Sequence, residues 1–208
     1  MKRVKPNLKF ESDLWDSGLL HVAGLDEAGR GALAGPVAVG AVILPHNDKT
    51  LLSRTLSRVR DSKQLTALAR ESLAPTIKDI ALAWSVGFAD ADEIDSQGIV
   101  HATRLAAIRA LHQFSISPEY LLTDFRLELP QLDISQTSIV RGDAHCLSIA
   151  CASILAKTER DALLRELDER HPGYGLGKHK GYGTQAHRSA LRRLGLSSVH
   201  RKTFSFKP

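Results

Sequence analysis

Two adjacent carboxylates, Asp26 and Glu27, stand near the end of a short apolar run and are followed closely by Gly29, Arg30 and Gly31. Neighbouring acids repel each other at neutral pH, and the pair becomes favourable when a divalent cation draws both carboxylates in as hard oxygen ligands. The two glycines let the backbone approach a ligand closely. This stretch therefore predicts a metal site beside a phosphate-binding loop.

Two further acids follow predicted strands. Residues 119–124 and 137–141 have the character of β-strands, and they end on or just before Asp124 and Asp143, respectively. Each acid taken singly is more often a surface or capping residue. Spacing alone does not bring acids from three strands together, so the hypothesis of a shared site rests on the whole set.

The elements that must position these acids are predicted from hydrophobic periodicity. Residues 21–26, 36–44 and 82–88 are expected to form an antiparallel meander of strands, which then gives way to strands that alternate with helices. Successive strand residues point to opposite faces, so Asp26 and Glu27 are expected to share a site through a bend at Glu27. The pattern predicts an α/β domain with a mixed five-stranded sheet flanked by helices.

Helical patterning covers residues 64–80, 99–114 and 148–170, and Pro75 is expected to kink the first of these helices. One face of the last helix carries only small side chains in its first half. We expect this face to let the helix lie close against the sheet. Its small residues are Ala150, Ala152, Ser153 and Ala156.

The length and composition limit the class of protein. The 208 residues suit one globular domain, and the longest apolar run, residues 37–44, is far too short to cross a bilayer. Residues 1–20 lack the continuous apolar stretch of a secretory signal, so we expect a cytoplasmic protein. Cys146 and Cys151 have neither disulfide-framework nor zinc-site spacing, and we expect both to be reduced core residues.

Charge is distributed unevenly along the chain. Residues 171–208 hold eight Lys and Arg, four His and no acid, whereas the rest of the chain has 20 basic and 23 acidic residues. This split is typical of an acid-bearing catalytic body with a basic segment that binds a polyanion such as nucleic acid, with a solvated tail as the alternative. We divide the chain into an N-terminal extension (1–20), a catalytic domain (21–170) and a basic C-terminal helical segment (171–208) packed on that domain.

Taken together, five segments resemble ribonuclease HII, the type 2 ribonuclease H family, and the resemblance runs from about residue 22 to residue 204. It implies the ribonuclease H fold, in agreement with the mixed sheet. It also implies a four-carboxylate site of Asp26, Glu27, Asp124 and Asp143 that binds two Mg²⁺ or Mn²⁺ ions. The segments that carry it are residues 24–31, 61–63, 141–143, 148–154 and 179–184.

The resemblance implies a nuclease that hydrolyses the RNA strand of RNA/DNA hybrids by two-metal-ion chemistry. It further implies a cut on the 5′ side of a single ribonucleotide embedded in duplex DNA, leaving 3′-hydroxyl and 5′-phosphate ends. Gly29, Arg30 and Gly31 would read the ribose 2′-hydroxyl, which distinguishes RNA from DNA, and the ring of Tyr182 would pack on the next deoxyribose. The implied partners are RNA/DNA hybrids and ribonucleotide-containing duplexes, and we expect a monomer.

Several other residues are candidates for roles in this site. Lys63 and Lys180 are expected to contact phosphates, and Ser148 either contacts a phosphate or caps its helix. Asp161 is the rival of Asp143 for the fourth carboxylate. We expect Asp161 instead to fix local structure through Arg160 or a backbone amide.

Two residues depart from the family pattern and bear on substrate affinity and metal preference: Phe125 stands where glycine is usual, and Gly98 where an asparagine often contacts nucleic acid.

Three alternative functions remain open at this point. Type 3 ribonuclease H shares the acids but has an extra domain before them, and only 25 residues precede Asp26 here. A catalytically silent hybrid-binding module would keep the ligands without turnover, and another nuclease or resolvase of this fold would lack the ribose-reading pair.

Overall fold

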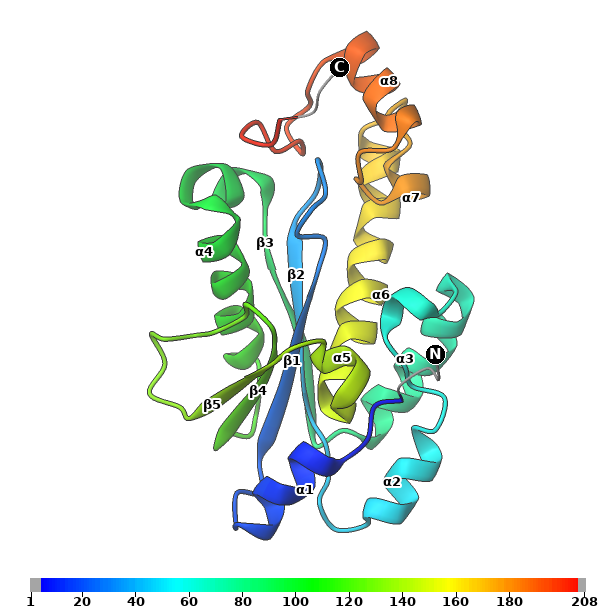
Figure 1. The fold of residues 1–208 in the computed structure, drawn as a ribbon. Coiled ribbons are helices and arrows are strands. Elements are labelled where there is room, and N and C mark those ends of the chain that lie inside the picture. The colour runs from blue at the N-terminus through cyan, green and yellow to red at the C-terminus, as the bar shows by residue number, and fades with distance from the viewer. Residues whose placement is uncertain (1–4, 206–208) are drawn as a thin grey trace.

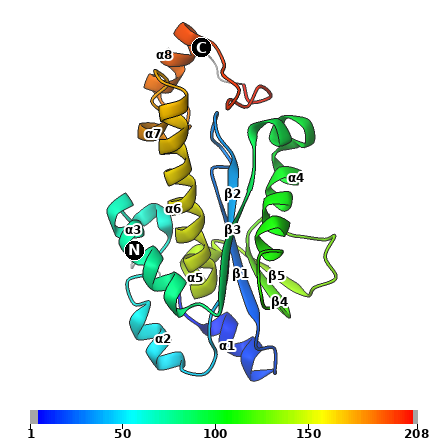
Figure 2. The same cartoon turned by 180° about the vertical axis from the view of Figure 1, so that it is seen from behind.

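The structure is a computed structural model that describes residues 5–205. A five-stranded mixed sheet lies between helical layers (Figures 1 and 2). As predicted, the first three strands form an antiparallel meander, and the last two join the first strand in parallel. The strands, in the spatial order β3-β2-β1-β4-β5, are β1 (Val22–Ala28), β2 (Val37–Ile43), β3 (Ala83–Ala89), β4 (Tyr120–Asp124) and β5 (Gln136–Ile139).

Helices cover both faces of the sheet. The long helix α6 (Leu147–Arg170) packs on one face, and α4 (Ala91–Leu111) packs on the other (Figure 1). The smaller helices lie around α6. They are α1 (Lys9–Asp16), α2 (Lys49–Thr55), the 3-10 turn η1 (Ser62–Gln64), α3 (Ala67–Ile80), α5 (Gly142–His145), α7 (Leu176–His179) and α8 (Gln185–Leu194).

Small residues bring α6 into close contact with the strands, as the sequence predicted. A Cβ atom on Gly40 of β2 would lie 2.2 Å from the carbonyl oxygen of Ala152, and one on Gly24 of β1 would lie 2.4 Å from the carbonyl carbon of Ser148. Real side chains do not pack at such distances, so only glycine fits at these two strand positions. This contact holds α6 directly against the strand that carries Asp26.

Helix α4 begins earlier than the sequence pattern predicted. It starts at Ala91 behind a capping box of Asp90 and Glu93, and it is broken at Gly98, whose φ is +78°. A Cβ on Gly98 would meet nothing within 4 Å, so the positive φ, and not crowding, favours glycine there. The predicted start at residue 99 corresponds to the second part of this broken helix.

Helix α1 and the described part of the basic C-terminal segment both pack on the body. Trp15 of α1 lies in the core that α6 covers, and Leu176 and Leu191 of the basic segment form a smaller core with Leu164 of α6. Pro75 lies inside α3 without ending it. Both cysteines are buried and free, as expected. Within residues 5–205, no helix has the length and apolar character that crossing a membrane requires.

Candidate active site

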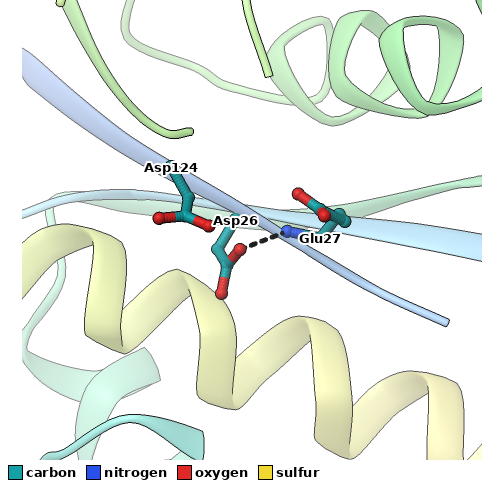
Figure 3. A group of neighbouring side chains, drawn as sticks. All are labelled: Asp26, Glu27 and Asp124. Atoms are coloured by element: carbon teal, nitrogen blue, oxygen red, sulfur yellow. Dashed lines mark hydrogen bonds between the residues drawn. The ribbon is translucent and has the colours of Figure 1, made fainter. Parts of the chain in front are cut away.

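The parallel pairing of β1 with β4 brings Asp26 and Asp124 side by side. The register pairs Leu25 with Thr123, so the next residue on each strand is an acid. β1 continues through Glu27 to Ala28 in its pairing with β2, so no break in the strand accompanies the acidic pair. The amide of Glu27 donates a 2.8 Å hydrogen bond to Oδ1 of Asp26, whose carboxylate points toward α6 (Figure 3).

Asp26, Glu27 and Asp124 form one tight acidic group. One carboxylate oxygen from each lies within 4.8 Å of the other two. Burial raises the pKa of Asp26 well above its usual range, and the neighbouring charge of Glu27 raises it further. Burial also raises the pKa of Glu27, against the opposing effect of Arg30. The group therefore carries unfavourable negative charge that a cation would relieve.

The donor set of this acidic group fits a hard divalent cation. Among the described residues, the buried Oε2 atom of Glu27 has no hydrogen-bond partner. An unsatisfied buried carboxylate oxygen is costly, and Mg²⁺ and Mn²⁺ prefer oxygen ligands of this kind. Three acids with one free buried oxygen are therefore suited to these ions.

Asp143 lies beside the acidic group but outside its tightest part. It sits in the short helix α5, whose Gly142 amide donates a 2.6 Å hydrogen bond to Oδ1 of Asp124. Nζ of Lys63 lies 3.9 Å from Oδ2 of Asp143. Burial, followed by the charge of Asp61, raises the pKa of Asp143 to about 6. The fourth predicted acid thus shares the electrostatic environment of the other three.

A cavity of about 200 Å³ opens next to the acidic group. Both the predicted loop, Gly29 to Gly31, and the predicted aromatic residue, Tyr182, line this cavity. Tyr182 is 37% exposed, and Nζ of Lys157 lies 5.3 Å from the centre of its ring. An acid, a glycine loop, lysines and an aromatic ring therefore surround one hollow. The lining residues are Glu27, Ala28, Gly29, Arg30, Gly31, Ser62, Lys63, Lys157 and Tyr182.

The sequence model of the family described as ribonuclease HII matches residues 23–207. The chain belongs to the ribonuclease HII family. It is 48% identical over 202 residues to the ribonuclease HII of Dehalococcoides mccartyi, a match that covers 97% of this chain and 94% of that protein. It is accordingly a ribonuclease H, a nuclease among the hydrolases, and both matches favour ribonuclease HII over the type 3 alternative.

Solved structures show the same fold. The crystal structure of ribonuclease H2 from Pyrococcus horikoshii OT3 is similar with a TM-score of 0.72 and 25% identity, over 88% of this chain and 93% of that one. Bst-RNase HIII in complex with Mn²⁺ is similar in fold, with a TM-score of 0.65 and 20% identity, over 93% of this chain and 70% of that one. The predicted ribonuclease H-like fold is therefore confirmed.

Two cations bind Asp161, which is not a member of the acidic group. Its carboxylate lies 3.3 Å from Arg70 and 2.7 Å from Nζ of Lys157, and the residue is only 5% exposed. The partners predicted for Asp161 were Arg160 or a backbone amide. That prediction was wrong in the partners, because Arg160 bonds elsewhere, but Asp161 does fix local structure by linking α3 to α6.

Two predicted nucleic-acid contacts lie outside the cavity. Ser148 is fully buried, its amide donates to Oε1 of Glu11 at 2.7 Å, and its hydroxyl lies 3.3 Å from Sγ of Cys146. Burial leaves it no access to a phosphate in this structure, and it does not cap the helix, which begins one residue earlier. Lys180 is partly buried and its Nζ donates to the carbonyl of Gly177, so its phosphate contact stays a prediction.

Sequence reasoning missed Lys157, which lines the cavity beside the acidic group. It lies four residues after Ser153 and four before Asp161 on α6, so helical spacing places all three on one face. That spacing was the available signal.

Phe125, the residue beside Asp124 that departs from the family pattern, is 47% exposed, and the guanidinium of Arg126 lies 5.2 Å from its ring centre.

Proposed function

We propose that this protein cuts duplex DNA on the 5′ side of an embedded ribonucleotide, besides hydrolysing the RNA strand of RNA/DNA hybrids. The products are 3′-hydroxyl and 5′-phosphate ends. The observation that carries the proposal is that Glu27 of the acidic group, the Gly29–Arg30–Gly31 loop and Tyr182 border the same cavity. A site that must both cleave a phosphodiester and recognise the adjoining sugar needs these parts together.

The acids serve to hold divalent cations. Asp26, Glu27, Asp124 and Asp143 would bind two Mg²⁺ or Mn²⁺ ions, which when bound supply activation of water and stabilisation of the leaving 3′ oxygen. Lys63, whose side chain is 79% exposed beside Asp143, would contact a phosphate of the cut strand. No side chain has to act as a covalent nucleophile in this scheme.

The recognition of the sugar rests on two features of the cavity. Backbone groups of Gly29, Arg30 and Gly31 read the 2′-hydroxyl, which both donates and accepts hydrogen bonds. The exposed ring of Tyr182 packs against the following sugar, where the absence of a hydroxyl favours an aromatic face. Lys157 adds positive charge next to that ring and attracts the phosphate of the nucleotide that packs there.

A labelled DNA duplex with one ribonucleotide tests this function. The expected result is a metal-dependent cut on the 5′ side of the ribonucleotide, with a 3′ end that a DNA polymerase extends. An all-DNA duplex of the same sequence should stay intact. Cleavage of long RNA/DNA hybrids without cleavage at the single ribonucleotide would refute junction recognition, and tight binding without any cleavage would indicate a silent binding module.

The aromatic contact has its own matched pair of variants. Tyr182→Phe keeps the ring and should retain cleavage at the single ribonucleotide, whereas Tyr182→Ala should lower its kcat/KM by roughly tenfold or more, the scale of one lost stacking contact. Equal activity of the two variants would show that the ring of Tyr182 does not contribute to substrate recognition.

A further inference from the structure

Two arginines lie completely inside the protein beneath the cavity loop. Arg160 is 0% exposed and Arg201 is 1% exposed. All seven hydrogen bonds of their guanidinium groups go to backbone carbonyl oxygens, and none goes to a carboxylate among residues 5–205. A buried cation normally has an acid as its partner, so a pair of guanidinium groups held only by carbonyls is unusual.

Arg201 binds the loop that borders the cavity. Its guanidinium donates to the carbonyl of Gly29 at 2.8 Å, to that of Arg30 at 2.9 Å, and twice to that of Gly35, at 2.9 and 3.0 Å. The planar, five-donor guanidinium is the side chain able to bind three carbonyls at once in a fixed geometry. One side chain of the C-terminal segment therefore sets the course of the loop.

Arg160 joins the same loop to the segment that carries the aromatic ring. It donates to the carbonyls of Ala34 at 3.2 Å, Pro36 at 2.8 Å and Lys180 at 3.0 Å. The carbonyl of Gly181 also accepts from the amide of Ala34 at 3.3 Å. The loop and the residues just before Tyr182 are thus connected through Arg160.

The carbonyl bonds decide where the loop amides point. In a trans peptide, the carbonyl and the following N–H point in opposite directions, and the structure contains no cis peptide among the described residues. Because the carbonyls of Gly29 and Arg30 face Arg201, the amides of Arg30 and Gly31 face away from it. Gly29 to Gly31 line the cavity and Arg201 does not, so these amides are on the cavity side.

Arg160 packs so closely against the loop that the backbone at Gly29 has little room to move. A Cβ atom on Gly29 would lie 1.9 Å from Nε of Arg160. The two guanidinium groups also place positive charge under the loop. Burial, followed by the nearby charge of Arg160, lowers the pKa of Arg201 to about 9, so the group is still charged at neutral pH. An anionic ligand above the loop would benefit from that charge.

We propose that Arg160 and Arg201 are positioning residues that hold the amides of Arg30 and Gly31 toward the cavity and thereby set the preference for a ribose over a deoxyribose. This inference rests on the proposed function, in which the loop reads the 2′-hydroxyl. The two arginines do not touch substrate. They act through the backbone, by fixing which groups of the loop the substrate meets.

Binding selectivity tests this role separately from catalysis. In an Asp26→Asn background, fluorescence anisotropy compares the Kd of two duplexes that differ by one 2′-hydroxyl. In Arg201→Lys, one compact ammonium replaces the planar fork whose separate nitrogens reach the three carbonyls. The preference for the ribonucleotide duplex should therefore fall about tenfold, the effect of one or two lost hydrogen bonds. Affinity for the all-DNA duplex should stay within about twofold, since charge is kept. Arg192→Lys, exposed on α8, is the matched control and should change neither value.

The outcomes separate the two proposals. A folded Arg201→Lys protein that keeps the full preference would overturn the positioning role while leaving the proposed function intact. A parent protein with no preference would overturn both. A general loss of affinity for both duplexes, with the preference unchanged, would show that Arg201 has a structural role only and would also overturn the inference.

Amide hydrogen exchange provides a measurement that needs no substitution in either arginine. In the Asp26→Asn protein, a peptide that covers residues 28–33 should exchange more slowly with the ribonucleotide duplex than with the all-DNA duplex, because the amides of Arg30 and Gly31 bond the 2′-hydroxyl. Equal protection by the two duplexes would contradict the inference even if Arg201→Lys failed to fold.

Discussion

The amide of Gly142 donates a 2.6 Å hydrogen bond to Oδ1 of Asp124, and this bond joins the end of β4 to the start of α5. Asp143 is the next residue of α5, so the bond holds the fourth acid beside the other three although it follows β5 by four residues. The acidic site is therefore assembled partly by backbone contacts, with one acid fixing the place of another.

Metal binding should stabilise the protein through the acidic group. A hundredfold excess of Mn²⁺ over its Kd should raise the free energy of unfolding by about 2.7 kcal/mol, because the ions bind the folded state only. Asp26→Asn should remove most of this gain. It should also stabilise the metal-free protein by about 1 kcal/mol, because it removes one of three repelling carboxylates. Urea denaturation with and without Mn²⁺ measures both effects.

The control for that experiment is Asp133→Asn, which changes an exposed acid in the loop before β5. It should respond to Mn²⁺ as the wild type does. If Asp26→Asn and Asp133→Asn responded alike, the stabilisation would come from ions bound elsewhere.

Metal affinity should depend on pH near 6. Burial and the charge of Asp61 raise the pKa of Asp143 to about 6, and the pKa values of Asp26 and Glu27 are raised too. Protons compete with the metal for carboxylates, so the affinity for Mn²⁺ should rise with pH and be about tenfold lower at pH 5 than at pH 7. Titration calorimetry in buffers of different ionisation enthalpy would also detect the released protons.

The same pKa shift has the opposite effect on the metal-free protein. Between the ordinary pKa of an aspartate, 3.8, and about 6, the folded state holds a proton on Asp143 that the unfolded state has lost. This contribution to the free energy of unfolding therefore grows as the pH falls through 6. For the metal-bound protein, an affinity for Mn²⁺ that is constant from pH 5 to pH 7 would show that Asp26, Glu27 and Asp143 are not the ligands.

Two glycines of the cavity loop should respond very differently to alanine. At Gly29, φ is +86° and the added Cβ would lie 1.9 Å from Nε of Arg160, so Gly29→Ala should cost about 2 to 4 kcal/mol of stability. At Gly31 the added Cβ would meet nothing within 4 Å, and the change should stay within about 0.5 kcal/mol. Denaturant midpoints of the two variants decide, and equal losses would mean that Arg160 does not pack against Gly29.

Asp161 and Asp143 should separate stability from metal binding. Asp161→Asn leaves the buried Arg70 and the partly buried Lys157 without their acid and should cost about 3 kcal/mol, while Mn²⁺ affinity stays near that of the wild type. Asp143→Asn should weaken metal binding and cleavage with little loss of stability. The reverse pattern, with turnover lost in Asp161→Asn and kept in Asp143→Asn, would assign the fourth carboxylate to Asp161.

The local parts of the fold were predictable because they depend on nearby residues. Alternating and apolar runs predicted all five strands to within about two residues, and the small residues of α6 predicted its close packing on the sheet. The predicted position of Asp143 at a strand end was wrong, because β5 ends at Ile139 and Asp143 belongs to the short helix α5. A four-residue helix has too little periodicity to be predicted.

The long-range parts were not predictable from one sequence. Ser148 has the residue type of a helix cap. Its amide nevertheless donates a hydrogen bond to the buried Glu11, 137 positions away. Arg201 resembles any basic residue of a charged tail, although it bonds the carbonyl of Gly29, 172 positions away. Such contacts depend on how elements pack in three dimensions, and residue type and spacing carry no signal of them.

The central claim is that the acidic group is the metal-dependent catalytic centre. Its most direct test is the rate of cleavage of an RNA/DNA hybrid, across a Mn²⁺ titration, by the wild type, Asp26→Asn, Asp124→Asn and the Asp133→Asn control. The account predicts that cleavage by the wild type and by Asp133→Asn requires the metal, and that both other variants lose at least about a hundredfold in kcat, as expected when ligands of the catalytic ions are removed. Near-normal cleavage by folded Asp26→Asn or Asp124→Asn protein would contradict it.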